Sequence, residues 1–74
     1  MAEYELIAYL AEKGSPPVDS MLFGSRPDDE WVYKLAESAN LGDFKYKTYA
    51  YGEPYLNFDN GFIVVRKHIP YKKD

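Results

Sequence analysis

The residue types that most often carry catalysis or bind metals are scarce in this chain. His68 is the only histidine, and the chain has no cysteine, which excludes thiolate chemistry and a cysteine zinc site. A metal site at His68 would need carboxylates at ligand spacing, and the sequence around it has none. We therefore expect neither a metal nor another cofactor.

The densest carboxylate cluster is Asp28-Asp29-Glu30, which directly follows Pro27. Acidic side chains are favoured at a helix N-terminus, so capping and the helix dipole explain the cluster without catalysis. The serines have no nucleophile-elbow context, and no glycine-rich phosphate loop is present. The sequence predicts that this protein is not an enzyme.

A second group of side chains combines aromatic rings with positive charge, a combination suited to binding. Rings and cations together suit single-stranded nucleic acid, but tyrosine and arginine are also the anchors that protein interfaces favour. A solvated sheet face is the third interpretation. We rank a protein partner first for the following residues: Lys45, Lys47, Tyr49, Tyr51, Tyr55, Arg66 and His68.

The first half of the chain reads as helical. Leu6, Ile7 and Leu10 have helical spacing, which predicts a helix over 3–13 that ends at Gly14. Residues 18–24 are too short a pattern to assign as helical or extended. A second helix is predicted over 27–40, with Ser25 as its cap in a capping box with Asp28, Trp31 in the core, and a left-handed residue within 40–42 at its end.

Beyond Asp43 the period changes to two, which predicts strands over 44–51, 55–59 and 62–69. A hairpin turn at Asn60-Gly61 would pair Phe58 with Ile63 and Leu56 with Val65. The residues expected to pack under the helices are Leu56, Phe58, Ile63, Val65 and Ile69, with Phe44, Tyr46 and Ala50. The predicted fold is α+β, two N-terminal helices packed on a three-stranded antiparallel β-meander, in a single small domain spanning 1–74.

Charge is segregated along this acidic chain, whose formal net charge is -3. Residues 1–43 carry nine acidic and three basic side chains, whereas residues 44–74 carry three acidic and six basic ones. Such asymmetry can orient a protein on a partner, although the acidic total argues against general affinity for nucleic acid. The chain also lacks a basic signal-peptide start and a long apolar run, so we expect a cytoplasmic location.

Three functions follow from these features. The first is a small non-catalytic protein-binding module, a regulator or inhibitor of the kind that phages and mobile elements encode, occluding a larger partner through the sheet face or the acidic helix start at Asp28, Asp29 and Glu30. The second is nucleic-acid binding, either through the sheet face or in a winged-helix-like arrangement. In the winged-helix arrangement the recognition helix would begin with acidic residues, which phosphates would repel. The third is a self-associating structural subunit, since tyrosine-rich sheet faces and the edge of the first predicted strand can pair across a two-fold axis.

Overall fold

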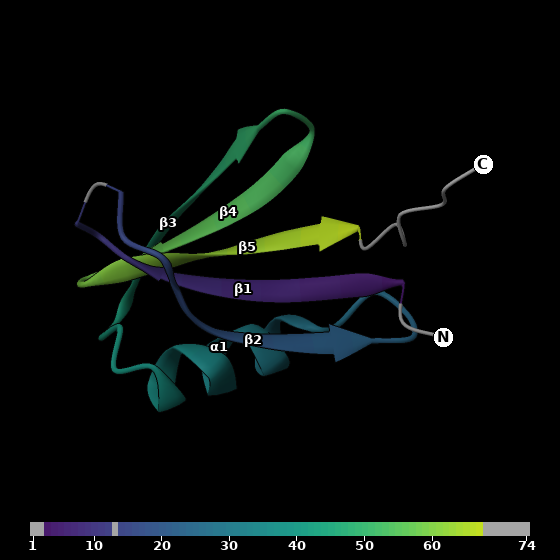
Figure 1. Cartoon of the computed structure of the whole chain (residues 1–74), viewed down its shortest axis with the longest axis horizontal. Helices are drawn as coiled ribbons and strands as arrows, with labels where there is room; N and C mark the ends of the chain where they lie inside the picture. The colour runs from purple at the N-terminus through teal and green to yellow at the C-terminus, as the bar shows by residue number, and fades with distance from the viewer. Residues whose placement is uncertain (1–2, 13, 68–74) are drawn as a thin grey trace.

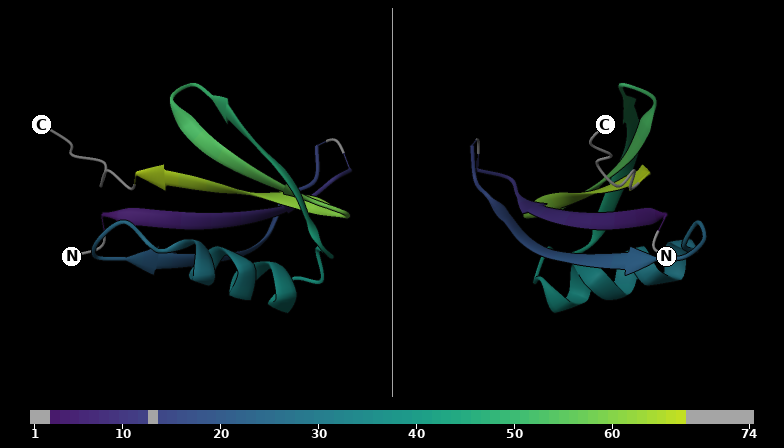
Figure 2. Two further views of the ribbon diagram at one scale, coloured as in Figure 1. Left: turned by 180° about the vertical axis from the view of Figure 1, so that it is seen from behind. Right: turned by 45° about the vertical axis from the view of Figure 1, so that its right-hand side comes forward.

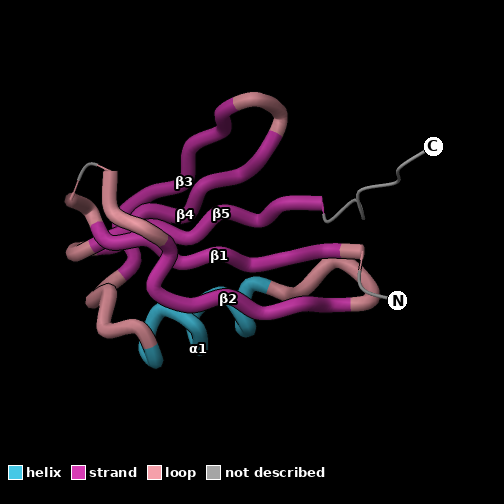
Figure 3. Tube along the Cα trace, in the orientation of Figure 1, coloured by secondary structure: helices cyan, strands magenta, loops and turns pink. Residues whose placement is uncertain are grey.

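The chain forms a five-stranded antiparallel sheet with one helix on one face. The computed structural model describes residues 3–12 and 14–67. The strands pair in the order β2-β1-β5-β4-β3, so the strand last in sequence lies beside the first (Figures 1 and 3). The elements are β1 (Tyr4–Leu10), β2 (Pro17–Phe23), α1 (Asp29–Ser38), β3 (Phe44–Ala50), β4 (Glu53–Phe58) and β5 (Gly61–Lys67).

The predicted fold of two helices on a three-stranded meander is wrong, because the first predicted helix is strand β1. In β1 three consecutive residues, Leu6, Ile7 and Ala8, are buried. Leu6 and Ala8 belong to the core under α1, while Ile7 lies on the other face of the sheet. A strand buried on both faces loses the alternation of apolar and polar residues, and its apolar run then resembles a helical stripe.

The segment 18–24, which the sequence left open, is extended and forms most of β2. β2 pairs with β1 from Tyr4 opposite Phe23 to Tyr9 opposite Pro17, and Val18 of β2 is an extra, bulged residue opposite the step from Ala8 to Tyr9. It is an outer strand, and its Met21 and Phe23 pack partly buried against the core. The N-terminal part of the protein is therefore a β-hairpin.

Helix α1 corresponds to the second predicted helix but begins at Asp29, two residues later than expected. Asp28 occupies the N-cap position with extended backbone and makes no side-chain capping bond, so the predicted capping box is absent. Trp31 was expected in the core but is 40% exposed, packing edge-on against Phe23 with the Lys34 ammonium 4.6 Å from its ring centre. Val32, Leu35 and Ala36 form the buried face instead.

The predicted left-handed end of this helix is confirmed. Asn40 has a φ of 61°, and its N–H donates to the Glu37 carbonyl. The Leu41 N–H donates to the Ala36 carbonyl at 2.9 Å, which completes a Schellman motif. The motif turns the fully buried Leu41 into the core and sends the chain toward β3.

The hydrophobic core lies between α1 and one face of the sheet. It collects residues from β1, α1, β4 and β5, and Figure 2 shows the helix lying along that face. Its buried members are Leu6, Ala8, Val32, Leu35, Ala36, Leu41, Leu56, Phe58, Ile63 and Val65.

The three predicted C-terminal strands are present, but the register of the last hairpin is shifted by two residues. Leu56 faces Ile63 rather than Val65, because the two-residue turn is Asp59-Asn60 and not Asn60-Gly61. A shift of two preserves the faces, so Leu56, Phe58, Ile63 and Val65 all reach the core as predicted. Ile69 lies outside the described residues.

Gly61 is a glycine because of close approach rather than because of a turn. A Cβ at this position would collide with the Tyr9 carbonyl oxygen and lie 2.8 Å from Leu41 Cδ2. β1 and the end of the helix therefore pack directly on the backbone of β5. The Asn-Gly pair marks this contact, and the sequence pattern alone cannot distinguish it from a hairpin signal.

Both central residues of the turn between β3 and β4 have left-handed backbone conformations. Tyr51 and Gly52 have φ values of 55° and 77°, the signs of a type I′ turn, and Tyr51 is 98% exposed. Positive φ is uncommon for a tyrosine, so this exposed tip carries backbone strain. Figure 2 shows the β3–β4 hairpin turned away from the direction of β1 and β5.

Candidate functional site: an aromatic groove with an acidic rim

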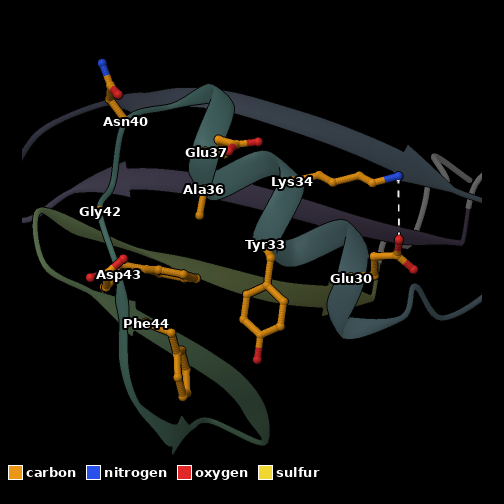
Figure 4. Close-up of a pocket in the computed structure, with 10 residues that line it drawn as sticks. Glu30, Tyr33, Lys34, Ala36, Glu37, Asn40, Gly42, Asp43 and Phe44 are labelled. Carbon is orange, nitrogen blue, oxygen red and sulfur yellow. Dashed lines mark ion pairs between the residues drawn. The ribbon is translucent and has the colours of Figure 1, made fainter.

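A groove of about 510 Å³ separates α1 from the start of β3. Its walls come from one face of the helix, from the loop that leaves it, and from the facing ends of β3 and β4. Figure 4 shows Tyr33 projecting from the helix beside Phe44 on the strand. The lining residues are Glu30, Tyr33, Lys34, Ala36, Glu37, Asn40, Gly42, Asp43, Phe44 and Phe58.

Three aromatic rings make the apolar part of this groove. Tyr33 meets Phe44 at 6.0 Å and Phe58 at 6.4 Å between ring centres, and Phe44 meets Phe58 at 5.7 Å. All three contacts are edge-to-face, the geometry that aromatic quadrupoles prefer. Phe58 is buried, whereas Tyr33 and Phe44 remain 46% and 41% exposed, so the groove presents fixed rings to solvent.

Carboxylates surround these rings. Glu30, Tyr33, Lys34 and Glu37 share one side of α1 because residues three, four and seven apart lie on one helix face. Asp43 adds a third carboxylate from the loop. Lys34 is the one cation among the lining residues, and its ammonium pairs with Glu30 at 3.9 Å. The rim is therefore net acidic.

A clamp around Asp59 fixes the wall of the groove. Asp59 Oδ2 accepts the Asp43 N–H at 2.9 Å, Asp59 N–H donates to the Asp43 carbonyl at 3.0 Å, and Oδ1 pairs with Lys45 Nζ at 3.0 Å. The hydrogen bond from the Asp43 N–H, and to a smaller extent the contact with Lys45, hold the pKa of Asp59 below its ordinary value. The hydrogen bond and charge of Asp59 raise the pKa of Lys45. Gly42 leaves the room that this clamp needs, since a Cβ there would lie 2.7 Å from Asp59 Cβ.

The predicted sheet-face residues do not form one surface. Lys47 and Tyr49 pair with Leu56 and Pro54, which places them on the helix side of the sheet rather than on the predicted outward side. The cause is a bulge between Phe44 and Tyr46, which keeps Phe44 on the core side but reverses the faces of the residues after it.

The remaining members of that predicted set are scattered. Lys45 is held by Asp59 at the bulge, and Tyr51 is at the hairpin tip. Tyr55 and Arg66 do lie on the face away from α1, as expected. Tyr46 and Ala50, predicted to pack under the helices, lie on that face too. His68 falls outside the described residues.

The face away from α1 carries its own apolar cluster. Ile7 and Val64 are opposite each other and buried, and the rings of Tyr9 and Phe62 stack at 5.0 Å beside Tyr55. The sequence missed Tyr9 because β1 was read as a helix.

The charge on this face is compensated. The Arg66 Nε donates to Glu53 Oε2 at 3.2 Å. Burial opposes the charge of Arg66, but Glu53 and the nearby Tyr9 and Tyr55 raise its pKa above the ordinary value. The face away from α1 therefore offers rings with little free charge.

The acidic helix start is only partly in the groove. Glu30 lines it, while Asp28 and Asp29 are exposed at the helix N-terminus and are not among the lining residues. Sequence reasoning did not assign the other lining residues to a binding site, among them Tyr33, Glu37, Asp43, Phe44 and Phe58. The spacing of Glu30, Tyr33 and Glu37 was a usable signal, but the facing strand end could not be placed without the tertiary structure.

No protein-family model, curated protein or solved structure matches this chain. Within residues 3–12 and 14–67, no three histidine, cysteine or carboxylate side chains gather closely enough to hold a metal ion. No helix in the same residues has the length and apolar character needed to cross a membrane.

Proposed function

We propose that this protein is a non-catalytic protein-binding module that takes a short basic and apolar segment of a partner in the groove between α1 and β3. The observation that carries the proposal is the pairing of exposed, fixed rings at Tyr33 and Phe44 with an acidic rim. Occlusion of that segment would give the module a regulatory or inhibitory role.

The rings supply the anchor. Aromatic side chains are enriched at the energetic centre of interfaces, and they lose little conformational entropy when their positions are already set. The edge-to-face contacts among Tyr33, Phe44 and Phe58 set those positions before a partner arrives. An aliphatic or aromatic side chain of the partner, packed against Tyr33 and Phe44, would remove apolar surface of both molecules from water.

The rim supplies the preference for basic residues. Between residues 28 and 43 the chain carries five carboxylates and one lysine, and that lysine already contacts Glu30 and the Trp31 ring. Lysine or arginine flanking the apolar anchor would meet Glu37 and Asp43, and the exposed face of Tyr33 can also hold a cation.

Nucleic acid fits this arrangement less well. Phosphates would be repelled by the rim, and the cations that the sequence grouped together are divided, with Lys47 on one face of the sheet and Arg66 on the other. The groove also has no histidine, cysteine or serine among its lining residues, which supports binding rather than catalysis.

The test is selection of ligands from a displayed library of random short peptides, followed by affinity measurements on a synthesised winner. We expect winners with an apolar anchor flanked by lysine or arginine, with affinity that falls as salt rises. Tyr33→Ala should weaken binding about tenfold or more, as removal of an interface anchor does. The matched control Tyr46→Ala removes an exposed tyrosine on the opposite sheet face and should bind normally.

Amide chemical shifts during titration locate the site independently. Perturbations confined to α1 and the start of β3 would support the proposal. Shifts centred on Tyr9, Tyr55 and Phe62, or equal losses in Tyr33→Ala and Tyr46→Ala, would contradict it. Short single-stranded DNA or RNA that binds more tightly than any selected peptide would move the function to nucleic-acid recognition.

A further inference from the structure

Strand β3 is at one end of the sheet order, so one of its edges faces away from β4. All of its residues are exposed except the half-buried Ala50. The other outer strand, β2, is protected in ways typical of sheet edges: Pro17 begins it, Val18 is a bulged residue within it, and the Asp19 carboxylate accepts the Ser20 N–H at 2.8 Å. Among the residues that the structure describes, β3 is the edge that is left open to pairing.

The hairpin geometry determines which backbone groups of β3 face outward. In a two-residue hairpin the residues that flank the turn, here Ala50 and Glu53, are a hydrogen-bonded pair, and such pairs alternate along the ladder. Thr48 and Tyr46 therefore bond to β4. Lys47 and Tyr49 direct their N–H and C=O groups away from it, and Pro54 opposite Tyr49, which has no N–H, agrees with this assignment.

We propose that two copies of the protein associate by antiparallel pairing of their β3 edges, with the two-fold axis at Thr48. In this register Lys47 of each copy exchanges both backbone hydrogen bonds with Tyr49 of the other copy. The side chains of Lys47 and Tyr49 lie on the same face, so each ammonium meets the exposed ring of the opposite tyrosine. Thr48 meets its own counterpart, a favourable cross-strand pair.

Neighbouring registers are worse. An axis at Lys47 places two lysines directly opposite each other, which repels. An axis at Tyr49 would pair Lys47 with Tyr51, whose φ of 55° has left the strand. The Thr48 register also brings the Tyr51-Gly52 turn of the second copy toward Phe44, at the end of β3 that borders the groove. Self-association goes beyond the proposed peptide binding, because it uses the backbone edge of β3 and meets the groove only at Phe44.

The first test is a disulfide across the axis, which is free of background because the chain contains no cysteine. A non-hydrogen-bonded antiparallel pair holds its Cα atoms about 4.5 Å apart, within disulfide range. Thr48→Cys should form a covalent dimer on mild oxidation. Lys47→Cys and Tyr49→Cys are matched controls, because in this register each lies more than about 7 Å from its own counterpart. Equal linking by all three variants would overturn the register.

The second test is sedimentation of the native sequence and of Thr48→Lys. The native protein should show a concentration-dependent dimer, and opposed lysines should raise its dissociation constant about tenfold or more. Ser20→Lys, the same change on the other edge, should leave the dimer unchanged, and circular dichroism checks that both variants fold. A native protein that is monomeric at the highest concentration reached would overturn the inference, and peptide binding by that monomer would leave the proposed function standing.

Discussion

β1 and β3 are strands of equal length with opposite surroundings. Each has seven residues, but β1 lies between β2 and β5 with Leu6, Ile7 and Ala8 buried, whereas β3 is an outer strand with no fully buried residue. The comparison separates two roles within one small sheet. Burial around β1 stabilises the fold, and β3 leaves its rings, charges and outer backbone edge exposed to solvent.

Removing a large side chain beneath β1 should have the largest effect. Leu35→Ala takes a buried side chain out of the core that α1 forms with Leu6, and we expect a loss of about 2–5 kcal/mol in the free energy of unfolding. Tyr49→Ala, in β3 and 67% exposed, should change it by about 0.5 kcal/mol or less. Urea denaturation followed by circular dichroism measures both, and comparable losses would break the comparison.

A smaller change is expected at the hairpin tip that follows β3. Tyr51→Asn replaces a tyrosine at a φ of 55° with a residue that tolerates this conformation, so stability should rise by about 1 kcal/mol or less. Tyr46→Asn is the matched control, because it makes the same replacement in the extended part of β3, where asparagine is disfavoured. Thermal unfolding compares them, and destabilisation by Tyr51→Asn would show that the tip is not strained.

The smallest effect concerns pH at the start of β3. The folded pKa of Asp59 lies below its ordinary value of 3.8 because of the Asp43 N–H and Lys45. The contribution of Asp59 to stability is therefore present above that value and is lost as the pH falls through the folded pKa. The urea midpoint of the native protein should fall as the pH is lowered through this range. Asp59→Asn should make that fall smaller, while Glu12→Gln, a change in an exposed loop, should leave it unchanged. If the urea midpoint of Asp59→Asn fell with pH as much as that of the native protein, Asp59 would make no pH-dependent contribution to stability.

The sequence predicted those elements whose pattern is local. The end of α1 at Asn40 and the faces of β4 and β5 follow from residues next to one another in the chain. β1 was missed because burial on both faces removed its alternation, and the faces of β3 were reversed by a single bulge residue at Lys45. The groove escaped prediction because Tyr33 and Phe44 belong to elements whose packing no local pattern specifies.

The placement of β5 between β1 and β4 has a kinetic consequence. β1 gains its second neighbouring strand only when residues 61–67, which are far from it in the sequence, pair with residues 4–10. Until then the apolar run Leu6-Ile7-Ala8 belongs to a lone hairpin with an open edge. Pairing between segments that are distant in sequence slows folding and prolongs the exposure of aggregation-prone apolar strands. We therefore expect closure of the sheet by its last strand to be the slowest step in folding.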